Sequence, residues 1–481
     1  MTRIAILSLL PMTLLAGCSI GPDYTAPPAH DIQVTDIMTT EADRIDVSLD
    51  VEMAWWDRFD DPVLSALMET AAGANTDVRL AAYRVEEARA NRAIAQARRR
   101  PFLSGSSSAS RAQASETAGG FGVTPGSSSI QNLFDLNVNL TWELDIFGRL
   151  LRLENAAEAQ LEATEGDRRA VMVTVFAEIG IAYAELRGLQ AQDAAAGRNI
   201  ELASRIVDLT QQVVDQGLAA DFDLVRARAD VTELAARRHR LLAGQRAAAA
   251  RIAFLTGQQP ADVMESLLAA GPQMIPSARI PVGLPSDLLR RRPDIRAAER
   301  RAAAASELVG VEMTDLLPSF SLTGVAGLSA ANVEDLFDAA SQTWSLSGGA
   351  RWSLFDSGAQ RADIAIARSR LGAAGTEYEA IILNALAELE TALAAYVYTA
   401  KELDGLVAAR SNRERAYALA LQRYNANTDT LFPALDAGLR LTALNADIAA
   451  RQQDLLVAEI SVYRALGGGW LAFENQGEGL E

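Results

Sequence analysis

Apolar and polar residues alternate without exception in LNVNLTWELD, residues 136–145. An alternation with period two indicates a β-strand whose two faces meet different surroundings. About ten residues is also the length that a tilted strand needs to cross the hydrocarbon core of a bilayer. Two interpretations stay open at this point, because a half-buried strand of a soluble sheet would alternate in the same way.

The same alternation returns in the second half of the chain, over Trp344–Leu354. Trp344, Leu346, Ala350, Trp352 and Leu354 share one face, and Ser345, Ser347, Arg351 and Ser353 share the other. A weaker strand pattern precedes each stretch across a Gly/Ser-rich loop, at residues 102–111 and 320–329. We therefore expect two hairpins, or four strands per chain. Because about eight strands is the practical minimum for closure, a membrane barrel would have to be shared between chains.

These strand patterns belong to an internal repeat of about 210 residues. Asp77-Val78-Arg79 and Asp294-Ile295-Arg296 each lie 24 residues before a proline, Pro101 or Pro318. Trp142 and Trp352 each lie six residues before a glycine, and from there it is 69 residues to Gly217 or Asn427 and 40 more to Gly257 or Gly467. The spacing predicts a first repeat over residues 51–260 and a second over 275–470.

Long proline-poor stretches rich in Ala, Leu, Glu and Arg fill the rest of each repeat. They predict three helices in each copy, over residues 61–100, 149–216 and 223–255, and over 294–317, 359–426 and 431–466. At 1.5 Å per residue, the longest helices would reach about 100 Å. The two shorter helices of a copy could stack end to end beside the long one, which would give four helical tubes per chain. The alanine-rich stripes favour close, coiled-coil-like packing.

Composition argues against an enzyme and against a resident cofactor. The chain has 44 basic and 62 acidic residues, two histidines and one cysteine. A net charge of −18 without a basic patch disfavours nucleic acid. Two histidines and one cysteine leave no multi-residue Cys/His zinc site and no sensible Cys/His dyad. The same negative charge makes a preference for cations a hypothesis for any channel.

The N-terminus has the pattern of a secretory signal peptide over residues 1–17, followed by the only cysteine, Cys18. Ala16-Gly17 before Cys18 resembles a bacterial lipobox, which implies cleavage and acylation at Cys18. Ser19 in the next position favours the outer membrane. Residues 18–50 are expected to form an extended tether, and residues 471–481 a polar tail. No uncharged apolar stretch of about 20 residues remains after cleavage, so we expect no transmembrane helix, and strands would have to do any spanning.

Short motifs in order along nearly the whole mature chain resemble the TolC-like outer-membrane factors, specifically the NodT-type efflux lipoproteins. The motifs are Gly21-Pro22-Asp23-Tyr24, Trp55-Trp56, Phe59-Asp60-Asp61-Pro62, Trp142-Glu143-Leu144-Asp145-Ile146-Phe147-Gly148-Arg149, Leu284-Pro285-Ser286-Asp287-Leu288-Leu289, Arg291-Arg292-Pro293-Asp294 and Tyr463-Arg464-Ala465-Leu466-Gly467-Gly468-Gly469-Trp470. The resemblance implies a mainly α fold with a transmembrane β part: a homotrimer with a 12-stranded β-barrel continuous with an α-helical barrel. Three chains of four strands and four tubes give the same numbers.

The resemblance also implies a function and a set of partners. The chain would be the passive exit duct of a tripartite efflux or export system in the outer membrane. A periplasmic membrane-fusion adaptor and an inner-membrane transporter of the RND type would act with it, and outer-membrane lipid would surround it. The alternative from another class is a lipid-anchored periplasmic coiled-coil scaffold or adaptor, which would leave the two amphipathic strand pairs without a purpose.

The family's periplasmic mouth maps onto the turns at Gly217 and Asn427. An apolar residue and an Asp four positions later ring the closed aperture in the family, and Phe432 and Asp436 match these positions. The two residues are one helical turn apart, so both lie on one face of the helix. An ordinary coiled-coil face would show the same spacing. Asn427 stands where a glycine is usual, and Asn also tolerates a left-handed turn.

A polar contact between a Tyr and an Asp locks the tip in family members, and Tyr424 and Asp223 match these positions. Asp429 stands where some relatives have an Arg of the lock, and an Asp cannot pair with Asp223. Arg423, one turn earlier, could substitute for that Arg.

Overall fold

The computed structural model describes residues 21–22, 24–25, 43–49, 54–113, 130–217, 220–271, 273–283, 291–426 and 428–473. The signal peptide, Cys18, most of the tether, Asn427 and the polar tail beyond residue 473 lie outside these ranges. The chain forms two compact units. The sheet unit comprises residues 1–27, 85–163 and 298–378, and the helix unit comprises residues 28–84, 164–297 and 379–481. Each unit contains parts of both sequence repeats.

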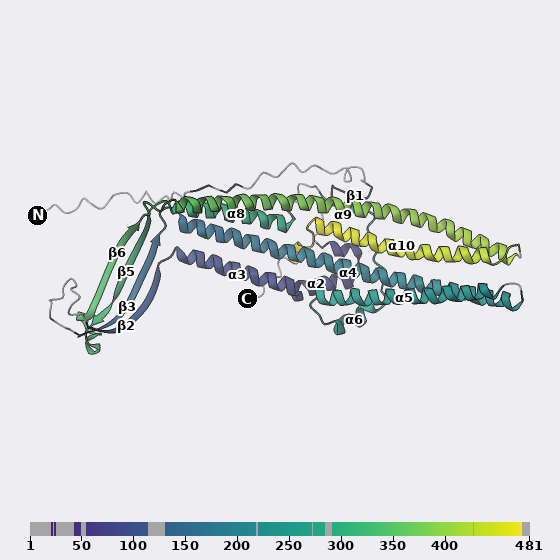
Figure 1. Ribbon diagram of the computed structural model, residues 1–481, viewed down its shortest axis with the longest axis horizontal. Coiled ribbons are helices and arrows are strands. Elements are labelled where there is room, and N and C mark those ends of the chain that lie inside the picture. The colour runs from purple at the N-terminus through teal and green to yellow at the C-terminus, as the bar shows by residue number, and fades with distance from the viewer. Residues whose placement is uncertain are drawn as a thin grey trace. The chain divides into compact units, whose positions relative to one another are not determined.

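Four antiparallel strands form the sheet in the order β2-β3-β5-β6 (Figure 1). They are β2 (Phe102–Gln113), β3 (Ile130–Leu144), β5 (Ser319–Ala330) and β6 (Gln342–Arg351). The two predicted hairpins are confirmed, and the pairing of β3 with β5 joins them into one sheet. β6 ends at Arg351, so the expectation that this strand runs to Leu354 is wrong.

The register gives the sheet one apolar and one polar face, because alternate residues of a strand point to opposite sides. Leu136, Val138, Leu140 and Trp142 of β3 lie opposite Leu328, Ala326, Gly324 and Leu322 of β5. The intervening positions of β3 are polar, and they lie opposite serine, glycine, valine and threonine of β5. These intervening β3 residues are Asp135, Asn137, Asn139, Thr141 and Glu143.

The repeat is visible in two equivalent hydrogen bonds at the base of the sheet. Trp142 Nε1 donates to the carbonyl oxygen of Arg99 at 3.0 Å, and Trp352 Nε1 donates to that of Leu316 at 3.0 Å. Each acceptor lies two residues before the repeated proline. The tryptophans therefore tie the end of the second strand of each hairpin to the end of the helix that precedes the first.

Helices, several of them very long, make up most of the described chain. In order they are α2 (Pro62–Ala74), α3 (Thr76–Arg98), α4 (Arg149–Asp215), α5 (Asp221–Leu255), α6 (Pro260–Leu268), α8 (Pro293–Thr314), α9 (Ala359–Asn425) and α10 (Phe432–Ala465). The predicted bounds of α4, α5, α9 and α10 are confirmed to within two residues. Asp61 caps α2, accepting a hydrogen bond from Val63 N at 2.9 Å.

One predicted helix is in fact two. The stretch 61–100 breaks at Asn75, whose backbone is extended and whose side-chain oxygen accepts hydrogen bonds from Asp77 N and Val78 N. Asn75 also donates to the carbonyl oxygen of Leu255 at 2.7 Å. The side chain thus starts α3 and fixes the break against the end of α5, at a place where Gly73, Asn75 and Thr76 have low helix propensity.

α9 contains an 18-residue window of mean hydropathy 1.5, so by length and composition it qualifies as a membrane span. The window is not free of charge, because no run of 18 residues in α9 lacks Asp, Glu, Lys and Arg, so the expectation that no uncharged apolar stretch of about 20 residues remains still holds. Within the helix unit, α9 buries Ile382, Leu389, Leu393 and Tyr396. The apolar residues therefore include a packing stripe of a helix in a bundle.

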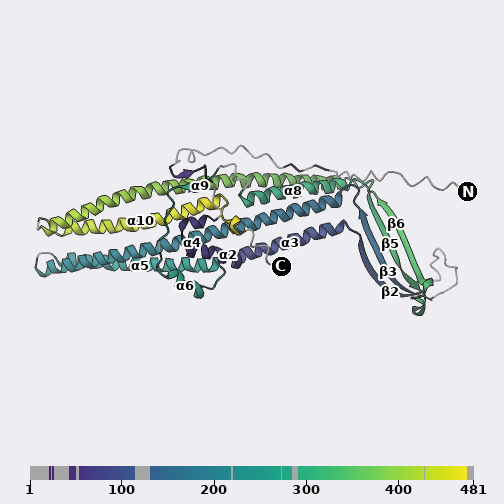
Figure 2. The same ribbon diagram turned by 180° about the vertical axis from the view of Figure 1, so that it is seen from behind.

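The core of the helix unit is aromatic. Trp55, from the short helix η1 (Trp55–Phe59), is 1% exposed and stacks on Tyr463 of α10 with ring centroids 5.6 Å apart. Trp56 stacks on Phe473 at 5.6 Å. Beside this core, β1 (Ile45–Asp46) and β4 (Ile280–Pro281) form a short parallel pair. Figures 1 and 2 show α4 beside α5 and α9 beside α10, each pair ending in a turn at the same end of the helix unit.

Candidate functional site

The two turns of the helix unit, where α4 leads into α5 and α9 into α10, hold every tip residue that the sequence singled out. We call residues 215–217 and 220–226 the first tip, and residues 423–426 and 428–440 the second tip. Gly217 has φ +72° and closes the first turn with a hydrogen bond to the carbonyl oxygen of Val214 at 2.8 Å. Thr428 closes the second turn, donating from its N and its Oγ1 to the carbonyl oxygen of Arg423. The conformation of Asn427 itself lies outside the described residues.

In the second tip, one side of α10 is packed against neighbouring helices and another side is exposed to solvent. Leu431, Ala434 and Gly438 are buried. A Cβ on Gly438 would lie 3.1 Å from both Leu202 of α4 and Tyr417 of α9, so the three helices meet closely here. The hairpin of α4 and α5 and the hairpin of α9 and α10 therefore contact each other where Gly438 lies against Leu202.

Phe432 and Asp436 lie on the open side of α10. The Phe432 side chain is 65% exposed. The Asp436 carboxylate pairs with Arg440, four residues later, through Nε and Oδ2 at 2.8 Å. Phe432, Asp436 and Arg440 thus follow one another at helical spacing on one stripe. Sequence reasoning missed Arg440, although its position at i+4 from Asp436 is a recognisable ion-pair spacing.

The lock residues are arranged differently. Arg423 pairs with Asp429 at 3.1 Å, so the acidic residue that departs from the family pattern is neutralised by the arginine that could substitute for the missing one. Tyr424 is half-buried and Asp223 is exposed near the start of α5. Within the described part of the single chain, no hydrogen bond between Tyr424 and Asp223 is observed, so their contact stays a prediction.

The first tip carries an equivalent of Phe432 that sequence reasoning missed. Phe222 lies five residues after Gly217, as Phe432 lies five after Asn427, and it is 71% exposed. The repeat spacing could have identified it. The position equivalent to Asp436 is Arg226, which is exposed, so the two tips present opposite charges at matching places.

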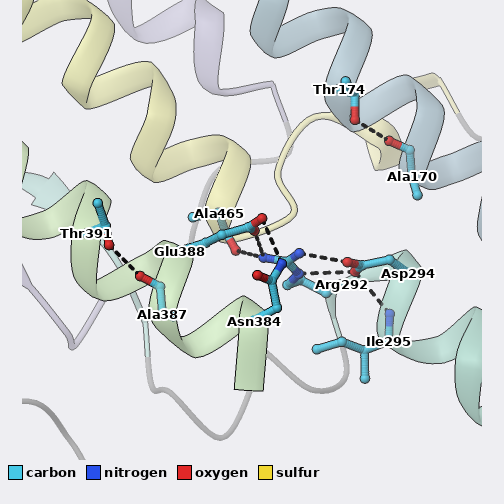
Figure 3. Close-up of polar contacts among 10 residues, drawn as sticks. All are labelled: Ala170, Thr174, Arg292, Asp294, Ile295, Asn384, Ala387, Glu388, Thr391 and Ala465. Atoms are coloured by element: carbon cyan, nitrogen blue, oxygen red, sulfur yellow. Dashed lines mark hydrogen bonds and ion pairs between the residues drawn. The ribbon is translucent and has the colours of Figure 1, made fainter. Parts of the chain in front are cut away.

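The Arg-Arg-Pro-Asp motif forms a second polar centre in the helix unit (Figure 3). Arg292, 7% exposed, pairs with Asp294 at 2.7 Å and with Glu388 of α9 at 2.8 Å. Its Nη1 also donates to the carbonyl oxygen of Ala465 at 3.1 Å, near the last turn of α10. Burial alone would lower the pKa of the Arg292 guanidinium, but the two carboxylates outweigh it and raise that pKa.

These contacts make Arg292 a joint between three helices. It connects the start of α8, the middle of α9 and the end of α10, all within the helix unit. An adjoining cavity of about 390 Å³ is lined by Thr174, Asn384 and Arg464 among others. Because every polar atom of the Arg292 guanidinium already has a protein partner, the arrangement suits a structural junction better than a ligand site.

The described residues offer little catalytic chemistry. They contain no group of three or more His, Cys, Asp or Glu side chains that could hold a metal ion. The polar face of the sheet is the remaining candidate for a functional surface. There both carboxylate oxygens of Glu143 accept hydrogen bonds from Arg149 Nη2 at 2.8 Å. Asp135 accepts hydrogen bonds from two serines.

Known proteins are similar to this chain over nearly its whole length. A family model described as outer membrane efflux protein matches residues 67–258 and 284–468. The probable efflux pump outer membrane protein SepC of Pseudomonas putida is 30% identical over 478 residues, 98% of each chain. Nodulation protein T of Rhizobium leguminosarum bv. trifolii is 28% identical over 457 residues, 95% of this chain and 96% of its own. The solved structure of the outer-membrane channel OprN is similar with a TM-score of 0.87 at 34% identity, covering 94% of this chain and 100% of that one.

Proposed function

The chain belongs to the outer membrane efflux protein family and is an outer-membrane efflux channel, and from this premise we propose that three copies form one passive exit duct. The sheets of three chains would close a 12-stranded barrel across the outer membrane, and their helices would continue it as a tube in the periplasm. The observation that carries the proposal is the sheet itself, which has an apolar face, a polar face and, among the described strands, two unpaired edges. Such a sheet needs partners to close.

The duct would work as one part of a tripartite pump. SepC is named as a component of an efflux pump, and a passive channel needs an energised transporter and an adaptor to reach it. We assign these roles to an inner-membrane transporter of the RND type and a periplasmic membrane-fusion adaptor. Acylated Cys18 would anchor each chain to outer-membrane lipid. The scaffold alternative is not favoured, because the relatives are channels and the amphipathic sheet would have no purpose.

The second tip would form the periplasmic aperture. Three copies of Phe432 and Asp436 would ring the axis, and each Asp436 already holds Arg440 on its own helix. Arg440 would reduce the repulsion between the three carboxylates in the closed state. Opening would be a population shift, because the adaptor binds the open form of the tip more tightly than the closed form.

The lock would hold the closed tip until the adaptor arrives. Tyr424 of the second tip and Asp223 of the first tip would supply a hydrogen bond between the two kinds of tip in the closed trimer. Arg423 would pair with Asp429 in the closed chain, as it does here. Arg423 would therefore contribute to the closed tip through Asp429, and Tyr424 would supply the contact to Asp223.

Single-channel conductance in planar bilayers tests the duct and the aperture together. We expect small, cation-preferring openings from the purified mature trimer. The Asp436→Ala variant should give larger openings or lose the preference, because the ring loses its carboxylates. The matched variant Arg440→Ala should strengthen the cation preference, because it leaves Asp436 without its cation.

The possible outcomes separate the two claims. Channels that do not respond to either substitution would retain the duct and discard the aperture. Anion-selective openings at neutral pH would contradict the cation preference. Purified trimers that never conduct, even with the adaptor added, would contradict the duct.

A further inference from the structure

Asp135 lies on the polar face of the sheet, in β3, between two serines of neighbouring strands. Ser108 of β2 and Ser329 of β5 are its direct partners in the register. Ser108 Oγ donates to Asp135 Oδ2 at 3.1 Å, and Ser329 Oγ donates to Asp135 Oδ1 at 2.7 Å. Each carboxylate oxygen is therefore held by a hydroxyl group that carries no charge.

The other charged residues of the four strands do not neutralise Asp135. They are Arg111, Glu143 and Arg351. Arg111 lies opposite Asn132, three positions from Asp135 along β3 and so on the other face. Arg351 lies opposite Ser319, at the far end of the sheet, and Glu143 has its own cation in Arg149. Among the described residues, Asp135 therefore has hydrogen-bond donors but no ion pair.

We infer that Asp135 is a charge-selecting residue of the strand section of the duct, which concentrates cationic solutes and depletes anionic ones on their way out. The inference rests on the proposed trimer, in which the polar face lines the lumen and three copies of Asp135 lie at one height. Serine hydroxyls fix the carboxylates in place without cancelling their charge. This charge is separate from the aperture at the helical tips, so selection by charge would have a second location in the duct.

A reporter cysteine tests the inference without requiring an open tip. Asn137→Cys places a thiol two residues from Asp135 on the same face, in a chain whose only cysteine is Cys18. The rates of labelling with a cationic and with an anionic methanethiosulfonate give a ratio that reports the local potential. The parent protein with Cys18 alone gives the background, and each variant is first shown to form an SDS-resistant trimer. Ser106→Cys, directly opposite Asn137, replaces the reporter if Asn137→Cys does not assemble.

We expect Asp135→Asn to lower the cation-to-anion rate ratio, and the effect to fade with salt. Coulomb's law in water with Debye screening gives a decrease of about tenfold at 10 mM salt, about fourfold at 0.1 M and almost none at 1 M. Asp135→Glu should preserve the ratio. The matched control is the double variant Glu143→Gln, Arg149→Gln, read by Thr141→Cys, which is two residues from Glu143 on the same face. It should change the ratio less, because it removes both members of the ion pair and leaves the net charge unchanged.

Two results would overturn the inference. A ratio that Asp135→Asn leaves unchanged at 10 mM salt, in trimers that both reagents label, would discard the selecting role of Asp135 and keep the duct. Failure of both reagents to label either reporter in SDS-resistant trimers would show that the polar face does not line water. That result would refute the proposed duct and the inference with it.

Discussion

At the residue scale, Glu459 of α10 is an acidic residue whose carboxyl group is completely buried. Its side chain has no exposed surface, and its Oε2 accepts a hydrogen bond from Ser277 N at 2.9 Å. Burial raises the pKa of Glu459, and the contacts with Ser277, Arg58 and Tyr463 only partly oppose the rise. The folded protein therefore keeps a proton on Glu459 at a pH at which the unfolded chain releases it.

This linkage predicts a pH dependence of stability with a defined sign. Between the ordinary glutamate pKa of 4.5 and the raised folded value, the folded state binds more protons than the unfolded state. The contribution of Glu459 is thus fully present below pH 4.5 and is lost as the pH rises through the folded pKa. Glu459→Gln cannot ionise, so its melting temperature relative to the wild type should increase as the pH rises through this window.

The control for this titration is Glu402→Gln, on an exposed side chain of α9 whose relative exposure is 54%. Melting curves of the purified protein in detergent between pH 4 and pH 8 give both differences. Parallel curves for the wild type and Glu459→Gln across the whole range would show that the buried carboxyl does not titrate as described.

The tip residues show what sequence can and cannot supply at this scale. The repeat spacing and the family pattern located Phe432, Asp436 and Arg423 without a structure. They could not reveal that Arg423 pairs with Asp429, because that pairing depends on rotamers in a folded turn. The pair of Asp436 with Arg440 could have been expected from its i, i+4 spacing in a helix.

At the scale of elements, the long helices were predictable and the joints between them were not. A period that continues over dozens of residues indicates a helix by itself, which is why α4 and α9 match their predicted bounds. The break at Asn75 is invisible to periodicity alone, although Gly73, Asn75 and Thr76 are poor helix formers and mark the place. It depends on the hydrogen bond from Asn75 to Leu255, 180 residues further along the chain.

The same joint gives a stability prediction. Gly257, just after α5, has φ +66°, and a Cβ there would lie 2.3 Å from the carbonyl oxygen of Ala74. Gly257→Ala should therefore cost about 1–2 kcal/mol for the left-handed backbone and about 1–3 kcal/mol for the forced displacement of Ala74. Gly217→Ala is the matched control, because Gly217 has φ +72° and open space around a Cβ. Urea denaturation of both variants measures the difference.

Equal losses in the two glycine variants would contradict the close approach at Gly257. A larger loss for Gly257→Ala would establish that the joint between α2, α3 and α5 is packed as described. The tip turn would then be the joint that tolerates a side chain, in keeping with Asn at the equivalent position 427.

At the scale of the whole molecule, the two free edges of the sheet demand an explanation. Among the described strands, β2 and β6 each pair on one side only. Long unpaired edges expose hydrogen-bonding groups, and a closed barrel removes such edges altogether. In the proposed trimer, β6 of one chain pairs with β2 of the next, and the third chain closes the ring. Sequence predicted the four strands and the need for sharing, but one chain cannot display the closure.

Cysteine cross-linking across these edges tests the shared barrel most directly. A panel of single cysteines along β2 is combined with single cysteines along β6, in full-length protein in outer membranes under mild oxidation. We predict that some combinations give covalent dimers and trimers on a denaturing gel, with nothing larger than three chains. Protein that carries a cysteine on only one of the two strands should give no covalent trimer on the same gel. A ladder that extends beyond three chains, or monomers throughout a panel that covers both edges, would contradict the trimeric duct.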